Sequence, residues 1–281
     1  MKYLPLFLIL FLSCTNKDLS ENKKNLIPEK TQPERIVSSH LQAIVDSAEL
    51  NGSILIFDPQ KQIYFSNDFE WAEIGHLPAS TFKIPNSMIF LESGVIANDS
   101  ALIKWDGKKR DFKMWERDFI FRDAFKYSCL PCYQEITRRL GYAKMKEFTS
   151  KLNYGNLVFD STDFDAFWVA GESTISQFQQ IDFLQRFYQH QLPISERTDK
   201  MVRDIFIMEK SDDYTLSGKT GWSFSEGQND NGWFVGYLQK KDGLFYFATN
   251  IEPTERFDMN SFIKIRKAIT MDALRHLKII G

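Results

Sequence analysis

The chain has 281 residues, of which 43% are hydrophobic and 15% aromatic. This composition supports one large domain or two modest ones with a sizeable core, and it excludes a chain that is disordered throughout. With 35 basic and 37 acidic side chains, the formal net charge of −2 offers no basic excess that would indicate a nucleic-acid partner. We therefore expect the partner to be a small molecule.

The N-terminus has the pattern of an export signal. Lys2 supplies a positive charge, and an apolar run extends from Leu4 to Leu12. This run is too short to cross a bilayer as a helix, which needs roughly 20 residues, but it suits the core of a signal peptide. Cys14 follows at the place where bacterial lipoproteins carry their lipidated cysteine. Residues 1–13 are thus predicted to be a signal peptide that directs the protein to the periplasm or cell envelope, with lipid anchoring through Cys14 or simple cleavage as the two outcomes.

Residues 14–36 are rich in Lys, Asn, Glu and Pro, which predicts a flexible tether. A single domain is then expected over residues 37–281, with a helical lobe at about 84–205. Alternating and apolar runs near both ends of this domain predict strands at 52–58, 62–66, 214–219, 233–239 and 244–251. Helical patterns are found at 134–140, after a capping box at Ser176 and Gln179, and at about 263–277. The predicted fold class is α+β, with an antiparallel sheet flanked by helices and a mainly helical lobe.

Ser80 and Lys83 form the first chemically suggestive pair. Three residues apart on a helix, they lie on one face, so the amine can reach the hydroxyl. Pro78 and Ala79 come just before, which places Ser80 near a helix start, where backbone N–H groups favour developing negative charge. A serine hydroxyl needs such a neighbouring base to act as a nucleophile. By itself this short motif is more often a surface helix.

Lys219, Thr220 and Gly221 end a predicted strand. The sequence Ser217 to Thr220 also resembles the end of a phosphate-binding loop, but that motif requires a glycine where this chain has Asp213. A nucleotide-binding loop is therefore excluded, and the tripeptide is either an ordinary strand end or part of a serine-enzyme site.

The combination of motifs is much more specific than each part. Ser80 with Lys83, then Ser128, then Lys219 to Gly221 resembles the three-element signature of penicillin-recognising serine enzymes. Further segments resemble those of class D (oxacillinase-type) serine β-lactamases, over nearly the whole chain from Val37 to Gly281. These segments are Pro78–Ile84, Tyr133–Gly141, Tyr154–Asn156, Phe167–Trp168, Gly232–Gly236 and Ile265–Ile269.

The resemblance implies hydrolysis of the β-lactam ring through an acyl-enzyme on Ser80, in the fold shared with penicillin-binding transpeptidases. It implies that Lys83 reacts with carbon dioxide to become an N-carboxylated general base, a step that needs a neutral, desolvated amine. The Trp168 indole N–H would hold this carbamate, and Leu130 would pack beside it. Carbon dioxide or bicarbonate would be needed for the carboxylation of Lys83, and no metal or organic cofactor is expected.

The same resemblance assigns the remaining roles. Ser128 and Lys219 would relay a proton to the leaving lactam nitrogen. The backbone N–H groups of Ser80 and Trp222 would form the oxyanion hole. Thr220 and Arg266 would bind the substrate carboxylate, for which a planar guanidinium is well suited. Trp168 as a core aromatic and Arg266 as a solvated helix charge are the plainer alternatives.

Two features depart from the class D pattern. Leu130 stands where the family usually has valine, which crowds the pocket of the modified lysine. Cys129 and Cys132 occupy positions that are usually apolar. We expect two buried free thiols that act as small hydrophobic groups, with a local disulfide as second choice and a redox pair as a remote third.

Other site types find little support. His40, His76, His190 and His276 stand singly, so no zinc site is predicted. A β-lactam sensor that acylates without turnover, a penicillin-binding D,D-peptidase and a catalytically inactive lipoprotein scaffold are the alternatives to a hydrolase. The tripeptide at Tyr154 and the presence of Trp168 argue against a peptidase. Neither the oligomeric state nor the preferred β-lactam follows from the sequence.

Overall fold

The computed structural model describes Met1 and residues 32–223 and 231–281. Residues 2–13 of the predicted signal peptide, Cys14 and the tether up to residue 31 lie outside the described residues, as do residues 224–230. Residues Pro33–Gly281 form one compact unit. Within the described residues, no helix is both long and apolar enough to cross a membrane.

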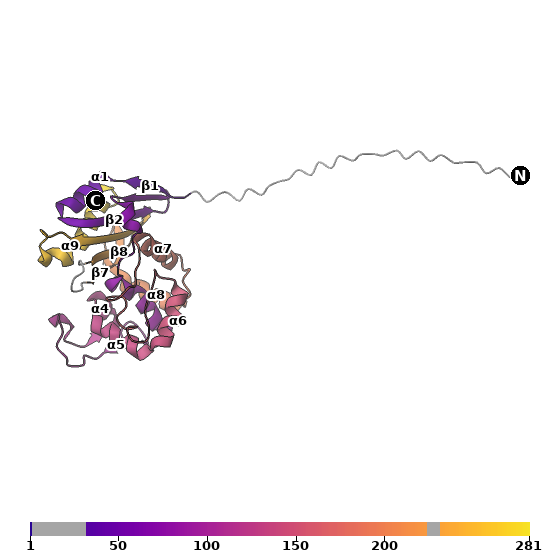
Figure 1. Cartoon of the computed structure of the whole chain (residues 1–281), viewed down its shortest axis with the longest axis vertical. Coiled ribbons are helices and arrows are strands. Elements are labelled where there is room, and N and C mark those ends of the chain that lie inside the picture. The colour runs from indigo at the N-terminus through magenta and orange to yellow at the C-terminus, as the bar shows by residue number, and fades with distance from the viewer. Residues whose placement is uncertain (2–31, 224–230) are drawn as a thin grey trace. The chain divides into compact units, whose positions relative to one another are not determined.

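The main sheet of the described residues has seven strands. Their order across the sheet is β1 (Glu34–Val37), β3 (Ile63–Ser66), β2 (Leu50–Asp58), β9 (Leu244–Pro253), β8 (Asn231–Lys240), β7 (Tyr214–Ser223) and β6 (Ile207–Lys210). All neighbours are antiparallel except β1 and β3. The pairing of β2 with β9 brings the two ends of the domain together, as the separated groups of strands predicted (Figure 1).

The first strand corrects the predicted tether. β1 begins at Glu34, so residues 34–36 belong to the sheet and not to a flexible linker. Its pairing with β3 starts with a backbone hydrogen bond of 2.8 Å from Glu34 N to Gln62 O. An edge strand contacts the sheet on one side only, and its residues here are largely exposed. Its sequence has two charged residues followed by two apolar ones, so it carries no alternating signal.

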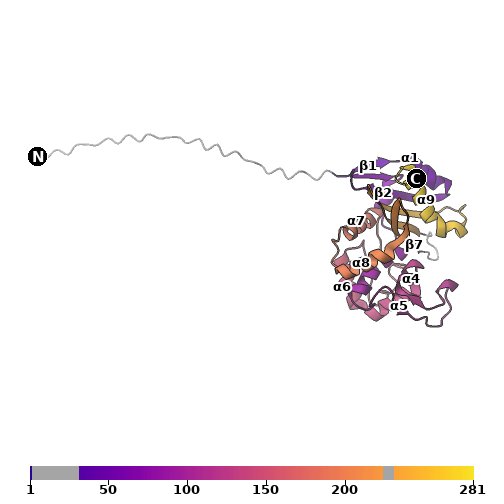
Figure 2. The same cartoon turned by 180° about the vertical axis from the view of Figure 1, so that it is seen from behind.

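Helices cover both faces of the sheet. On one face lie α1 (Ser39–Ser47) and α9 (Phe262–His276), whose Leu41 and Leu274 share a core with Ile54 of β2 and Phe247 of β9. On the other face lies α7 (Gln177–Tyr188), which starts with the predicted capping box at Ser176 and Gln179. Figure 2 shows α7 and α8 (Glu196–Phe206) between the sheet and the rest of the helical lobe.

The helical lobe surrounds a helix that is buried on all sides. This helix is α3 (Lys83–Glu92), in which every residue from Lys83 to Leu91 is buried. Around it pack α5 (Leu130–Leu140), which ends at Gly141 as predicted, α6 (Tyr142–Leu152) and α8. A helix that is enclosed in this way belongs to the core of the domain.

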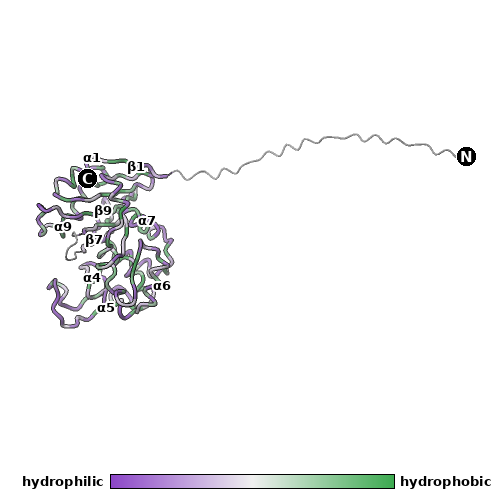
Figure 3. The backbone as a smooth tube through the Cα atoms, viewed as in Figure 1, coloured by the Kyte–Doolittle hydropathy of each residue, from purple (hydrophilic) through white to green (hydrophobic). Residues whose placement is uncertain are grey.

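Short elements complete the lobe and its outer loop. They are α2 (Phe69–Glu73), the 3-10 helices η1 (Ala79–Phe82), η2 (Lys113–Trp115) and η3 (Met259–Ser261), the two-stranded sheet of β4 (Leu102–Ile103) and β5 (Phe119–Ile120), and α4 (Phe121–Lys126). In Figure 3 the loop that projects beside α4 and α5 is predominantly hydrophilic. Most of its residues from 104 to 117 are exposed, so this loop adds little to the apolar core of the lobe.

Candidate active site

Ser80 lies in η1, immediately before α3. The Lys83 Nζ atom donates a hydrogen bond of 3.0 Å to Ser80 Oγ. Ala79, just before the serine, has a φ of 52°, in the left-handed region that residues with a Cβ atom rarely adopt. Such a conformation persists only where the surroundings hold it in place, and it is common at functional sites.

A buried hydrogen-bond network fixes η1 on the side that faces the helical lobe. Thr81 Oγ1 donates to Pro78 O at 2.6 Å and lies 3.0 Å from the hydroxyl of Tyr154. Gln180 of α7 completes the network, with its amide donating to Thr81 Oγ1 at 2.9 Å and its oxygen accepting from Tyr154 at 3.0 Å. Tyr154 thus fixes the turn that carries Ser80. Sequence reasoning singled out Tyr154 only through the family resemblance and missed this contact, because its partners are 26 and 73 residues away.

The sheet holds the same turn from the other side. Leu77 O accepts hydrogen bonds from Asn231 Nδ2 at 2.7 Å and from Trp233 Nε1 at 2.9 Å. On β7, Gly221 packs so closely that a Cβ atom there would lie 3.2 Å from Thr81 Cγ2 and 3.3 Å from Pro78 O. The glycine therefore lets β7 approach η1 and brings the Lys219 segment beside Ser80.

Lys83 is enclosed by apolar and aromatic side chains. It is fully buried, and its Nζ lies 5.1 Å from the centroid of the Tyr133 ring. Phe82, beside it in the chain, stacks on Trp168 and meets Phe167 edge-on. Burial lowers the pKa of Lys83 to about 7, because the charged amine loses its hydration. A substantial fraction of the amine is therefore neutral near pH 7.

Two buried polar groups near this lysine have no hydrogen-bond partner among the described residues. They are Trp168 Nε1 and the carboxamide of Asn86, both of whose polar atoms are unpaired. Asn86 follows Lys83 by three residues on α3, so the two side chains lie on the same face of this helix. An unpaired buried polar group costs free energy, which indicates that a further partner belongs here. Sequence reasoning missed Asn86, although its spacing from Lys83 was a usable signal.

Ser128 and Lys219 meet across the site from separate parts of the chain. Lys219 Nζ donates to Ser128 Oγ at 2.5 Å and to Thr220 O at 3.0 Å. Burial places the pKa of Lys219 well below its ordinary value, and the positive charges of Lys83 and Arg266 lower it further. Ser128 has a φ of 51°, so its backbone also lies in the left-handed region.

The residues predicted to bind the substrate lie at the end of β7 and, for Arg266, on α9 against it. Thr220 is half-buried there, and Trp222 follows with its ring against Phe112 and Phe262. The Arg266 guanidinium donates to Gly221 O, and to Phe262 O and Ile263 O at 3.0 and 3.1 Å. Burial lowers the pKa of Arg266 to about 10, so it remains charged at neutral pH. The plainer alternative of a solvated helix charge is wrong for Arg266, because the side chain is buried.

The cysteine expectation requires a correction. Cys129 and Cys132 form a disulfide, with their Cα atoms 5.3 Å apart, and are not two free thiols. This Cα separation lies within the usual range for a disulfide. Between them, Leu130 begins α5 and is partly buried against the lobe core.

His76 does not join Ser80. Its ring stacks on Trp71 and meets Trp233 edge-on, and burial lowers its pKa to about 4. It is a core histidine. The described residues contain no group of three or more His, Cys, Asp or Glu side chains that could hold a metal ion.

Comparisons with known proteins agree with this geometry. Residues 55–275 match the family model "Penicillin binding protein transpeptidase domain". β-Lactamase OXA-48 of Klebsiella pneumoniae is 38% identical over 82% of this chain and 84% of its own length, and β-lactamase OXA-10 of Pseudomonas aeruginosa is 36% identical over 84% and 88%. The crystal structure of a class D β-lactamase from Sebaldella termitidis is 38% identical and matches with a TM-score of 0.83, over 89% of this chain and 100% of that one. This chain therefore belongs to the penicillin-binding transpeptidase family and, within it, to the class D serine β-lactamases.

Proposed function

We propose that the protein hydrolyses penicillin-type antibiotics through an acyl-enzyme on Ser80, with N-carboxylated Lys83 as general base, and so confers resistance to them. The observation that carries this proposal is the fully buried Lys83 amine at 3.0 Å from Ser80 Oγ, with a pKa lowered to about 7. An amine in this state can react with carbon dioxide and can accept a proton from the serine.

Ser80 supplies the nucleophile. Its Oγ forms a bond to the lactam carbonyl carbon as its proton passes to the base, and the lactam C–N bond then breaks. The backbone N–H groups of Ser80 and Trp222 are the donors that would stabilise the negative oxygen, since β7 lies close against η1 at Gly221. A water molecule then attacks the acyl carbonyl carbon, the ester bond to Ser80 Oγ breaks, and the free enzyme is restored.

The surroundings of Lys83 fit a carboxylated side chain. The unpaired Trp168 Nε1 would donate a hydrogen bond to the carboxylate group, and the unpaired Asn86 carboxamide on α3 would supply a second donor. When carboxylated, Lys83 supplies an anionic oxygen base for both the acylation and the deacylation step. Phe82 and Phe167 keep bulk water from this pocket, which preserves the neutral amine that the modification requires.

Ser128 and Lys219 deliver the proton to the leaving nitrogen. The hydrogen bond between Lys219 Nζ and Ser128 Oγ and the lowered pKa of Lys219 suit a group that releases and takes up a proton more readily than an ordinary lysine. Thr220 and Arg266 then bind the substrate carboxylate. Because Arg266 already donates to Gly221 O, it also fixes the strand end that carries Thr220.

The proposed location is the periplasm or cell envelope. It rests on the sequence of residues 1–13 and on Cys14 as a lipidation site. An oxidising compartment is also consistent with the disulfide between Cys129 and Cys132. Labelling with a radioactive fatty acid in a bacterial host, with Cys14→Ser as control, tests lipidation directly.

A turnover assay with a chromogenic cephalosporin, with and without added bicarbonate, tests the function. We expect many turnovers per enzyme molecule and a gain on adding bicarbonate after the buffer has been freed of carbon dioxide. A single burst of one equivalent without further turnover would identify a sensor or a peptidase instead.

Lys83→Ala should retain at most slow acylation, and turnover close to wild type in this variant would remove the general-base role.

A further inference from the structure

We propose that the Cys129–Cys132 disulfide is a positioning element for Ser128, so that β-lactam turnover requires this pair to be oxidised. The inference rests on the proposed proton relay through Ser128. It concerns a feature of this chain, since the class D resemblance implies apolar residues at both cysteine positions.

The turn between α4 and α5 places Ser128 in an unfavourable backbone conformation. Ser128 has a φ of 51°, a value that glycine adopts freely but that is unfavourable for a residue with a Cβ atom. Two backbone hydrogen bonds close the α4 side of this turn, from Ser128 N to Phe125 O at 3.1 Å and from Cys129 N to Ala124 O at 2.9 Å. A left-handed serine needs such over-determined surroundings.

The disulfide closes the other side of the turn. Cys129, directly after Ser128, caps α5, with its Sγ accepting a hydrogen bond of 3.3 Å from Cys132 N. The covalent link to Cys132 then ties this capping residue to the first turn of α5. The residue after Ser128 is thereby anchored to the lobe, and the turn loses alternative conformations that would move the serine hydroxyl.

The position of this hydroxyl is what the relay depends on. Lys219 Nζ approaches Ser128 Oγ from β7, 91 residues further along the chain. Ser128 and Lys219 do not belong to a common helix or strand. Their contact therefore depends on how firmly the α4–α5 turn is held in place. Small displacements of a catalytic group cost large factors in rate.

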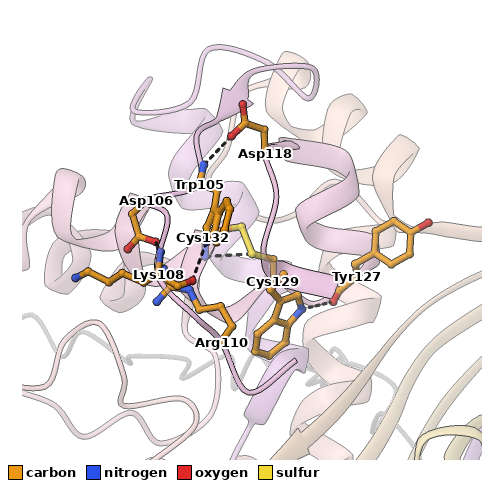
Figure 4. Close-up of a disulfide and its surroundings, with 9 residues drawn as sticks. Trp105, Asp106, Lys108, Arg110, Asp118, Tyr127, Cys129 and Cys132 are labelled. Carbon is orange, nitrogen blue, oxygen red and sulfur yellow. Dashed lines mark hydrogen bonds and ion pairs between the residues drawn. A yellow bond between two sulfur atoms is a disulfide. The ribbon is translucent and has the colours of Figure 1, made fainter. Parts of the chain in front are cut away.

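The disulfide is formed by two buried cysteines, with Cys132 8% and Cys129 1% exposed. It lines a cavity of about 320 Å³ together with Trp105, Arg110 and Trp115. Figure 4 shows Trp105 and Arg110 around the disulfide, while the Tyr127 ring points away from it. This cavity is the route by which a small dithiol would approach the sulfurs. Reduction transfers two electrons and two protons from the dithiol, breaks the S–S bond, leaves two cysteine thiols and converts the dithiol to its own disulfide.

The experiment compares two substrates of the same acyl-enzyme. One is a chromogenic cephalosporin, whose leaving nitrogen needs a proton. The other is an activated aryl ester of phenylacetic acid, whose phenolate leaves without one. The full chain carries Cys14→Ser throughout, so that only two thiols appear after treatment with dithiothreitol. Oxidised protein, reduced protein, and the variants Cys129→Ser and Cys132→Ser are measured in parallel.

We expect reduction to lower kcat for the cephalosporin by about tenfold or more, with KM nearly unchanged, because a positioned proton donor is worth roughly 10²–10⁴ in rate. Acylation by the ester should change less than twofold, and reoxidation should restore the cephalosporin rate. The two serine variants should match the reduced protein and ignore dithiothreitol. An unchanged kcat once two thiols can be titrated, or an equal loss on both substrates, would overturn the inference. Oxidised protein that shows no cephalosporin turnover at all would refute the proposed function instead.

Discussion

Lys83 shows how a single buried side chain sets the chemistry of the site. Burial removes the hydration of its charged amine and lowers its pKa, so the neutral form is favoured in the folded protein. The unfolded chain restores the ordinary pKa. Folding therefore creates the reactive amine that the local sequence, on its own, does not possess.

We predict that turnover falls as the pH drops through about 7, the pKa of Lys83. Since this pKa is lowered, the amine gains a proton on the acidic side, and at pH 6 the neutral fraction is roughly a tenth of the total. Added bicarbonate should restore much of the loss by mass action. The measurement is kcat against pH at fixed bicarbonate concentrations, and a profile that is insensitive to bicarbonate would argue for an unmodified lysine.

Trp168→Phe removes the indole N–H and keeps an aromatic ring at this position. Because Trp168 Nε1 has no partner among the described residues, this change removes a donor without breaking a hydrogen bond present in the structure. We expect deacylation to slow more than acylation, and the bicarbonate concentration for half-maximal activity to rise. Single-turnover kinetics separate the two steps, with Trp105→Phe in the outer loop as the matched control. Unchanged deacylation would remove Trp168 from the carbamate site.

Asn86→Leu tests the second unpaired group. An apolar side chain of similar volume removes two unsatisfied buried polar atoms, so the free energy of unfolding should rise by about 1–2 kcal/mol. Turnover should fall, because the pocket loses a donor that the carboxylated Lys83 can use. Urea unfolding and kcat provide the two measurements. A more stable variant with full activity would assign Asn86 no part in the chemistry.

At the scale of elements, η1 is held between the lobe and the sheet. Tyr154 and Gln180 bond to Thr81 from one side, while Asn231 and Trp233 bond to Leu77 O from the other. The nucleophile therefore sits at the junction of the two parts of the domain. A change in either part is transmitted directly to Ser80.

Tyr154→Phe should lower the free energy of unfolding by about 1–3 kcal/mol, because the Gln180 oxygen loses its partner in a buried place. It should also lower kcat several-fold by loosening η1. Tyr142→Phe on α6 is the matched control, since its ring packs edge-on against Phe159 and Phe164. Equal stability of the two variants would contradict the proposed importance of the network.

At the scale of the whole molecule, the folded unit starts earlier than the sequence indicated. β1 covers the edge of β3 through a parallel pairing from Glu34 to Val37. A chain that starts at Ser38 leaves this edge open, and we expect it to lose about 1–3 kcal/mol of stability relative to one that starts at Pro33. Urea denaturation of both chains checks this, and equal midpoints would show that β1 adds nothing.

The sequence by itself determined five strands of the main sheet, several helix boundaries and the local pairs. Alternating runs indicated five strands, the capping box at Ser176 marked a helix start, and the three-residue spacing of Ser80 and Lys83 placed amine and hydroxyl together, because all of these depend on neighbours within a few residues. The motif set also identified the family that the comparisons show.

The tertiary structure decided what depends on distant contacts. It brought Lys219 to Ser128, buried Lys83 and Arg266, joined Tyr154 to Thr81, added β1 to the sheet edge and paired Cys129 with Cys132. Burial and the approach of two side chains from separate elements are properties of packing. Local spacing does not encode them, and this is why the reactive state of the site follows from the fold.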